Sequence, residues 1–221
     1  MNKKTRILFV DDFNLCRSFF SSALRVEPGY DVFEAEPSGD VCGIIGKIRP
    51  DVVILNIAMM HVSGFSLLRN ILQAHSRCRV LTISYLHHGH LHAMRAVRAG
   101  AAGYVAPDES RKSFLQAIAE VAAGGMYVAP VVRRRISSGL SRNCSDDEHP
   151  CNRLSSREFE VFCLTGLGYV PKLIADRMQV SVKTVETYRE RIREKLGLLD
   201  GSELLYYATG FIREQSLPGM L

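Results

Sequence analysis

The sequence lacks the features that mark several large classes of protein. No window approaches the roughly 20 uninterrupted apolar residues that a membrane span needs. The apolar run behind the basic start covers only residues 7–10, which is too short for the core of a signal peptide. We therefore expect a cytoplasmic protein. The sequence also has no nucleotide-binding glycine motif, nucleophile elbow or metalloprotease helix, so no enzyme is indicated.

Paired cysteines are missing as well. The six cysteines show no C-x-x-C spacing, so neither a zinc ribbon nor a thioredoxin-type site is indicated. In a reducing cytosol we expect free thiols, although Cys144 and Cys151 stand in a polar stretch and could form a redox-sensitive pair. The remaining four are Cys16, Cys42, Cys78 and Cys163.

The chain has more positive than negative residues, but the excess is not concentrated in one segment. The net charge of +5 would suit a nucleic-acid partner. Lys and Arg minus Asp and Glu give 14 − 11 = +3 for residues 1–130, 4 − 3 = +1 for 131–152, and 10 − 9 = +1 for 153–221. Because every segment carries part of the excess and none is strongly basic, charge alone does not identify the partner.

Short apolar runs alternate with segments of helical periodicity over residues 1–125. Five strand–helix repeats with nearly continuous Val, Ile and Leu strands predict an α/β fold, a doubly wound five-stranded parallel sheet with helices on both faces. The predicted strands are Arg6–Val10, Tyr30–Glu34, Val52–Asn56, Val80–Ser84 and Gly103–Val105. The predicted helices are Phe13–Arg25, Val41–Ile48, Phe65–His75, His90–Ala99 and Ser110–Ala123.

Ligands of such sheets bind outside the carboxyl ends of the strands. The candidate site residues are therefore those at or just after the strand ends, namely Asp11, Asp12, Asn56, Ser84 and Pro107.

Residues 126–152 change character and predict a linker, with a short helix conceivable at its start. The three arginines at 133–135 either touch DNA phosphates or keep the linker soluble.

Residues 153–221 predict a small all-α domain. Ser155 and Glu158 have capping-box spacing, which starts a helix at Ser156. Pro171 suits the first position of a short helix that ends at Met178. Ser181 then caps a third helix that ends at Gly197, and a fourth covers residues 202–214. The two short helices joined through residues 179–180 match a helix-turn-helix.

The third helix of this domain has an apolar and a polar side. Val182, Val185, Ile192 and Leu196 form the apolar stripe, and the opposite side is polar. A solvated charged face is the simplest interpretation of such a helix, and only its helix-turn-helix context favours a role in binding.

Three motifs carry a family resemblance. Leu-Ser-Ser-Arg-Glu-Phe-Glu-Val-Phe (154–162), Ile-Ala-Asp-Arg-Met (174–178) and Ser-Val-Lys-Thr-Val-Glu-Thr-Tyr-Arg (181–189) resemble the LuxR/NarL-type DNA-binding domain. The resemblance implies double-stranded DNA as a partner, with the third helix in the major groove. It implies base contacts from Glu186, Thr187 and Glu190, and phosphate contacts from Lys183, Thr184, Tyr188 and Arg191.

This chain departs from that family at several of these positions. Glu186 and Glu190 stand where basic or amide side chains are common, and a carboxylate is repelled by phosphates unless it accepts from cytosine N4. Tyr188 replaces a usual histidine, and its hydroxyl can still donate to a phosphate. Val170 stands where a serine cap is common, which removes a capping oxygen worth about 1 kcal/mol. We therefore expect modest affinity that depends on a dimer.

The first domain resembles the receiver domain of response regulators, a flavodoxin-like fold. The resemblance rests on Ile-Leu-Phe-Val-Asp-Asp (7–12), Pro-Asp-Val-Val-Ile-Leu (50–55), Gly64 and Ala-Gly-Ala-Ala-Gly-Tyr-Val (99–105). Receivers take up phosphate on an aspartate at the end of the third strand, with Mg²⁺ and a lysine after the fifth strand. By resemblance the acidic pair Asp11 and Asp12 is kept.

The acceptor and the lysine are not kept. The acceptor position holds Asn56, whose amide is neither a nucleophile nor an anionic Mg²⁺ ligand, so Mg²⁺ binding is expected to be weak or absent. The lysine position holds Pro107, which has no cation and no backbone donor. An Asp-to-Asn change alone would also fit a laboratory substitution, but Pro107, Met60 and Ser63 together favour native divergence.

A histidine-rich loop follows the fourth predicted strand. His88 and His92 are four residues apart and could share one Zn²⁺ or Ni²⁺, but histidines in such loops are more often only exposed. The resulting hypothesis is a sequence-specific, phosphorylation-independent transcription regulator. It is expected to be a homodimer whose receiver-like domain dimerises or binds a protein or small ligand.

The alternative is an interaction adaptor in which the receiver-like domain captures a protein. Candidate dimer surfaces are the first and fifth helices and the last one, with Leu204, Leu205, Tyr207 and Phe211. DNA target, direction of regulation and input signal are not readable from the sequence.

Overall fold

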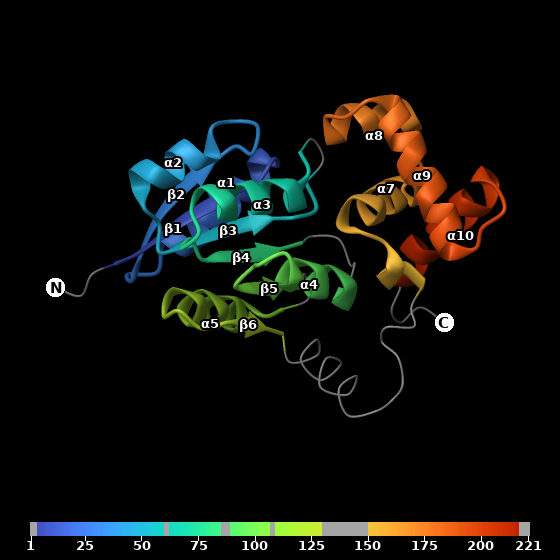
Figure 1. Ribbon diagram of the computed structural model, residues 1–221. Helices are drawn as coiled ribbons and strands as arrows, with labels where there is room; N and C mark the ends of the chain where they lie inside the picture. The colour runs from blue at the N-terminus through green and yellow to red at the C-terminus, as the bar shows by residue number, and fades with distance from the viewer. Residues whose placement is uncertain (1–3, 60–61, 85–88, 107–108, 130–149, 217–221) are drawn as a thin grey trace. The chain divides into compact units, whose positions relative to one another are not determined.

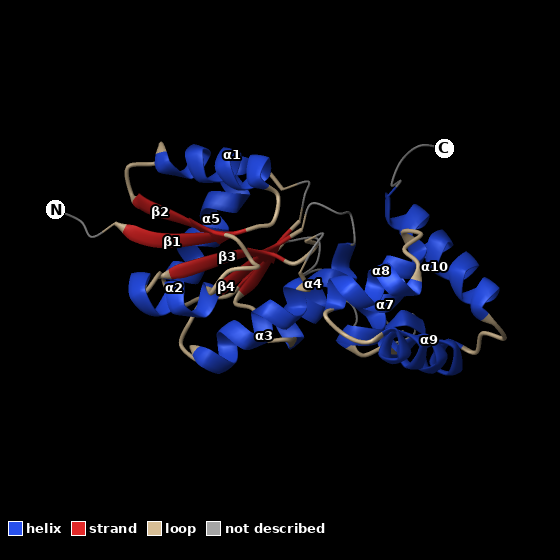
Figure 2. Ribbon diagram, turned by 90° about the horizontal axis from the view of Figure 1, so that it is seen from above, coloured by secondary structure: helices blue, strands red, loops and turns tan. Residues whose placement is uncertain are grey.

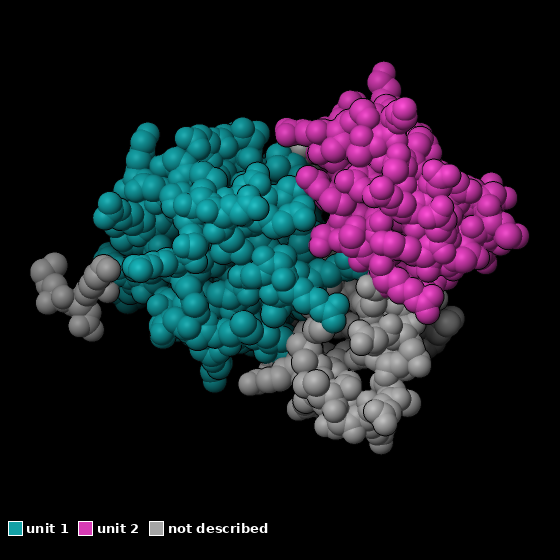
Figure 3. Space-filling model, viewed as in Figure 1, with its two compact units in different colours: residues 1–86, 92–130 teal, residues 87–91, 131–221 magenta. Residues whose placement is uncertain are grey.

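The computed structural model describes residues 4–59, 62–84, 89–106, 109–129 and 150–216. The chain forms two compact units, residues 1–86 with 92–130 and residues 87–91 with 131–221 (Figure 3). Each unit has its own buried core, so each is described by itself.

The first unit is built on a parallel sheet. Its strands run in the order β2-β1-β3-β4-β5-β6, and every neighbouring pair is parallel (Figure 1). They are β1 (Thr5–Val10), β2 (Tyr30–Ala35), β3 (Val52–Asn56), β4 (Val80–Ile83), β5 (Gly103–Val105) and β6 (Tyr127–Val128). The central strands β1 and β3 are buried on both faces, as their uninterrupted apolar sequences require. The predicted parallel α/β fold is confirmed.

The number of strands was predicted wrongly, because the sheet has six strands in the described residues and not five. The sixth strand, β6, lies inside the predicted linker and pairs with β5, with Tyr127 opposite Gly103. Its two residues are too few to show a period, and their pairing with β5 is the only reason that they form a strand. Gly103 permits the contact, because a Cβ at this position would lie 2.6 Å from the Tyr127 carbonyl oxygen.

Helices cover the sheet on both faces. Helices α1 (Asn14–Arg25) and α5 (Arg111–Ala122) lie over one face, and α2 (Val41–Ile48) and α3 (Gly64–Ala74) over the other (Figure 2). Helix α4 (Gly89–Arg98) connects β4 with β5. On the α1 and α5 face, alternate residues of the strands such as Ile7 and Phe9 pack with Ile118. The sheet therefore has two apolar cores, and its polar residues gather at the strand ends.

The second unit is helical. A short 3₁₀ turn (Pro150–Arg153) precedes α7 (Ser156–Gly166), α8 (Pro171–Met178), α9 (Val182–Leu196) and α10 (Gly201–Ser216). The capping box of Ser155 and Glu158 is present, Pro171 opens α8, and Gly197 ends α9 in the left-handed conformation at φ 69°. Val170 makes no side-chain cap bond. The expected helix starts and ends are confirmed to within two residues.

The core of the second unit joins all four helices. It centres on Phe159, Phe162 and Phe211, whose rings contact one another at centroid distances of 5.4 to 6.3 Å. Val185 and Ile192 attach α9 to this core. Leu204 and Phe211, which we proposed for a dimer surface, are buried here and are therefore core residues. On α10 the exposed apolar residues are Leu205 and Tyr206.

The helices and the cysteines of the described residues bear on two further expectations. Among the described residues, no helix has both the length and the apolar character needed to cross a membrane. Cys16, Cys42, Cys78, Cys151 and Cys163 are free thiols. Cys151 is fully buried in the helical core, and Cys144 lies outside the described residues.

Candidate functional site

The carboxyl ends of three neighbouring strands bring the predicted pocket residues together. Asp11 and Asp12 directly follow β1, Asn56 is the last residue of β3, and Ser84 directly follows β4. Asn56 pairs in register with Ile83, the residue before Ser84. Asp11, Asn56 and Ser84 are buried, and Asp12 is half-buried. Pro107 lies outside the described residues.

Asn56 is held by hydrogen bonds that fix the orientation of its amide. The backbone N–H of Ala58 donates to Asn56 Oδ1 at 2.9 Å, so the oxygen faces that loop. The Nδ2 group consequently faces Asp11 and donates to its Oδ1 at 3.4 Å. The same Asp11 oxygen accepts the Phe13 backbone N–H at 2.9 Å. The side chains of residues 11 and 56 are therefore linked directly, donor to acceptor.

Arg17 is the site residue that sequence reasoning missed. Its guanidinium donates to the backbone carbonyl of Asp11 at 2.6 Å and to the Glu36 carboxylate at 3.2 Å, and its Nε lies 3.6 Å from Glu34. It also bonds the Asn14 side chain. Its side chain is only 10% exposed.

The signal for Arg17 was present in the sequence. Residues 13, 17, 20 and 24 recur at helical spacing, and an arginine on such an apolar face needs carboxylate or carbonyl partners to be buried. Arg17 joins the end of β1 to β2. It does not replace the lysine expected at Pro107, because its guanidinium donates to the backbone oxygen of Asp11.

The proposed histidine site cannot be placed. His88 lies outside the described residues, and for His92 only the backbone, in α4, is described. Within the described part of the chain, no group of three or more His, Cys, Asp or Glu side chains is arranged to hold a metal ion.

Helix α9 presents a polar surface made of the residues proposed for DNA contacts. Lys183, Glu186, Thr187, Glu190 and Arg191 are exposed, whereas Thr184 and Tyr188 are half-buried. Tyr188 packs against the helical core. The apolar stripe was predicted wrongly at one position, because Val182 is 45% exposed.

Local hydrogen bonds restrain several side chains of this surface. The hydroxyls of Ser181 and Thr184 lie 2.8 Å apart, and the Thr187 hydroxyl donates to the Lys183 carbonyl at 2.9 Å. Glu186 lies 3.8 Å from the Arg189 guanidinium, which reduces the repulsion that this carboxylate would exert on a phosphate. Glu190 forms no ion pair with another described residue, so it is the acidic group of this surface that weighs most against an anionic ligand.

An ion pair between the exposed Lys195 and the buried Glu158 connects α9 to the start of α7. Lys195 Nζ lies 2.7 Å from Glu158 Oε2, and the same oxygen accepts the Ser155 backbone N–H at 2.6 Å. Burial on its own raises the pKa of Glu158, but the hydrogen bonds from Lys195 and Ser155 outweigh it, and the pKa lies below its usual range. The Glu158 carboxylate is thus ionised at neutral pH, and its ion pair with Lys195 holds the C-terminal end of α9.

A parallel α/β unit with an acidic strand-end pocket, followed by a helix-turn-helix, defines a class of two-domain regulators. Two family models match this chain: "Response regulator receiver domain" over residues 7–119 and "Bacterial regulatory proteins, luxR family" over residues 152–208. The chain belongs to the response regulators, with a receiver domain and a LuxR-type helix-turn-helix. It is a DNA-binding transcription regulator of the two-component type and not an enzyme.

Individual relatives match along nearly the whole chain. The chain is 26% identical over 215 residues to the transcriptional regulatory protein DegU of Brevibacillus brevis, covering 90% of this chain and 91% of the relative. It is 29% identical over 217 residues to the DNA-binding transcriptional activator DevR/DosR of Mycobacterium tuberculosis, covering 97% and 98%. The structure of RcsB from Salmonella enterica serovar Typhimurium bound to promoter rprA has a TM-score of 0.68 at 20% identity, covering 94% and 99%. The last likeness shows the fold alone.

Proposed function

We propose that this regulator binds specific DNA sequences as a homodimer without being phosphorylated, and that its receiver serves for dimerisation or for an input other than phosphate. The observation that carries the proposal is the hydrogen bond from the Asn56 amide to Asp11. An amide at this position cannot accept a phosphoryl group as a carboxylate does, because its nitrogen is not nucleophilic.

The same contact argues against a Mg²⁺ site. Mg²⁺ requires oxygen ligands in octahedral geometry. At residue 56 the oxygen is engaged by the Ala58 N–H, and the group turned toward Asp11 is an NH₂ donor. The residues present do not fit the ion that receivers use, and no step of the proposed function depends on it.

DNA binding is assigned to the exposed side chains of α9. Lys183 and Arg191 supply positive charge for phosphates, and Thr187 and Glu190 can reach base edges, where a carboxylate selects cytosine N4. Because acidic residues share this surface, we propose that two copies must act together for useful affinity. Leu15, Phe19 and Val26 are exposed on and just after α1, which supports α1 as part of a pairing surface.

The test is selection of bound duplexes from a random DNA pool by the full-length protein, with and without acetyl phosphate and Mg²⁺. Enrichment of the same palindromic sequence in both conditions is the expected result. Enrichment that requires acetyl phosphate would refute phosphorylation independence. No enrichment in either condition would favour the adaptor function described below.

Restoring the carboxylate is expected to restore cation binding but not full phosphate chemistry. In Asn56→Asp the new side chain faces Asp11, so two carboxylates must share the pocket, and Mg²⁺ relieves their repulsion. We expect Mg²⁺ affinity to rise by about tenfold or more in calorimetric titration. Phosphoryl incorporation should stay low, since Pro107 supplies no cation. Efficient labelling of the unsubstituted protein by acetyl phosphate would contradict the proposal.

Removing a cation from α9 is expected to weaken binding to all duplexes. Lys183→Ala should lower affinity for specific and random DNA alike and reduce the slope of log K against log salt by about one unit. Lys47→Ala removes the same charge from α2, which is not among the candidate dimer surfaces, and is the matched control. Fluorescence anisotropy at several salt concentrations measures both slopes. Equal slopes for the two variants would remove Lys183 from the interface.

A protein-interaction adaptor is the second candidate function. The exposed carboxylate of Glu190 favours the adaptor, because a carboxylate is repelled by DNA phosphates unless it accepts a hydrogen bond from cytosine N4. Glu190→Gln distinguishes the two: a DNA reader changes its preferred base at one position, whereas an adaptor gains only weak, sequence-independent affinity.

A further inference from the structure

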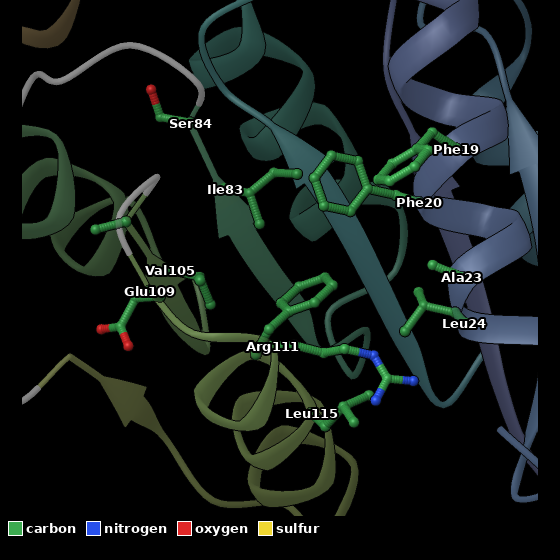
Figure 4. Close-up of a pocket in the computed structure, with 12 residues that line it drawn as sticks. Phe19, Phe20, Ala23, Leu24, Ile83, Ser84, Val105, Glu109, Arg111 and Leu115 are labelled. Carbon is green, nitrogen blue, oxygen red and sulfur yellow. The ribbon is translucent and has the colours of Figure 1, made fainter. Parts of the chain in front are cut away.

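A cavity of about 640 Å³ lies inside the receiver, between α1, α5 and the ends of β4 and β5 (Figure 4). Small-molecule sites typically measure about 300–1,000 Å³, whereas protein interiors otherwise leave few voids larger than a water molecule. Of the strand-end residues that the structure describes, Ser84 lines the cavity and Asp11, Asp12 and Asn56 do not. The cavity therefore lies beside the described part of the strand-end pocket and shares Ser84 with it.

The walls of the cavity are apolar and partly aromatic. Nine of the twelve lining residues are apolar. Phe20 of α1 and Phe114 of α5 contact each other edge to face, with ring centroids 6.1 Å apart, and together form part of the wall. Leu24, Ile83 and Val105 form the deep wall and are almost fully buried. Such walls favour a ligand with an aromatic ring, which can continue the edge-to-face packing.

The charged residues at the rim are engaged elsewhere. Arg111 forms an ion pair with Glu27, at the end of α1. Burial and then the nearby Glu109 raise the pKa of Tyr127, and the Glu109 carboxylate points away from Phe19 and Phe20 (Figure 4). Among the described lining residues, no charged group therefore stands as a counter-ion in the apolar part of the cavity, and burying an unpaired charge is strongly unfavourable. Ser84, the third polar residue among the described lining residues, lies beyond Ile83 and away from Phe19 and Phe20 (Figure 4).

We infer that this cavity binds an uncharged, mainly apolar aromatic small molecule, and that such a molecule is the input of this regulator. The inference rests on the proposed function, in which the input is not phosphate. A second copy of the chain is a poorer occupant. A helix of that copy, packed on the surface of α1, would contact the exposed Phe19. It would be too wide to reach Leu24, which is only 3% exposed. A small molecule reaches both.

Binding can be measured on the full-length protein with an uncharged aromatic probe, N-phenyl-1-naphthylamine, whose fluorescence increases in apolar surroundings. The chain has no tryptophan, so the background emission is low. We expect saturable binding of one probe per chain and a rise in melting temperature with probe concentration. Sedimentation velocity in parallel should show no change of oligomeric state on binding.

Filling the cavity should abolish this binding. Ala23→Phe adds a ring inside the lining, whereas Ser22→Phe adds the same ring to the adjacent, exposed position outside it. We expect Ala23→Phe to weaken probe binding by about tenfold or more, and Ser22→Phe to leave it within about twofold. Ala106→Leu fills the cavity from the opposite wall, at the end of β5, and serves if Ala23→Phe does not fold.

The results separate the two proposals. Absent or unsaturable binding by the native protein, unchanged affinity in the filled variants, or binding that appears only with a change of oligomeric state would each overturn the cavity assignment. All three leave the DNA selection unaffected. Failure of the proposed function would instead appear as DNA binding that depends on acetyl phosphate, whatever the probe does.

Discussion

Replacing Gly166 with alanine is expected to destabilise the helix-turn-helix unit by about 2 to 3 kcal/mol. Gly166 is the last residue of α7, where this helix crosses α10. A Cβ at this position would lie 2.4 Å from the Ala208 carbonyl oxygen and 2.8 Å from Ile212 Cγ1. Since the nearest atom belongs to the backbone of α10, a side-chain rotation cannot remove the clash and the two helices must separate.

Gly210→Ala provides the matched control. Gly210 lies inside α10, and a Cβ there would meet no atom within 4 Å. The same substitution should stabilise the unit by roughly 0.5 to 1 kcal/mol, since alanine restricts the unfolded chain and favours helix. Hydrogen exchange of the α7 and α10 amides reports opening of this unit alone. Equal exchange in both variants would show that α7 and α10 do not approach as closely as described.

Loss of the Glu158 carboxylate is the second large effect. Its side chain is 4% exposed and bonds both Ser155 and Lys195. Glu158→Gln keeps an acceptor for the cap but loses the charge-assisted bond to Lys195, and we expect a loss of about 1.5 to 3 kcal/mol. Lys195 is 39% exposed and can return to water, so the loss stays below that of a fully buried pair. Glu160→Gln is the control, because it removes a carboxylate from the Arg157–Glu160 ion pair within α7.

The pKa of Glu158 gives this pair a defined pH dependence. Because the folded-state pKa lies below the usual value of 4.5, the stabilisation is fully present above pH 4.5. It is lost as the pH falls through the folded-state pKa. Unfolding measured from neutral pH down to acid should therefore show a steeper loss of stability in the native protein than in Glu158→Gln. Parallel curves for the two proteins would mean that Glu158 contributes no linked stability.

The sequence was sufficient to predict most elements because their signals are local. Ser155, Pro171, Ser181 and Gly197 each mark a helix end through contacts within a few residues. Strand β6 was not predictable in this way, since two residues show no period and the pairing partner is about 24 positions away. Val182 follows the apolar spacing of α9, yet it is the first residue of this helix and lies outside the core, with 45% of its surface exposed.

The candidate sites also differ in whether the sequence could predict them. The strand-end residues follow from chain topology, because carboxyl ends of parallel strands share one edge. Two partners of Arg17, Asp11 and Glu36, directly follow two different strands, and the cavity depends on how α1 and α5 pack across the sheet. No spacing rule in one segment contains that information. The direction of the Asn56 amide required the position of the Ala58 N–H, which only the folded loop provides.

The surroundings of Asn56 also determine how this residue ages. An asparagine turns into aspartate when the backbone nitrogen of the following residue attacks its side-chain carbon. Here that nitrogen belongs to Ile57, whose N–H is held by the Ile83 carbonyl at 2.9 Å. The amide itself is fixed at both ends, and the branched side chain of Ile57 crowds the approach. We therefore expect chemical deamidation, which would place an acidic residue at position 56, to be much slower here than at an exposed asparagine.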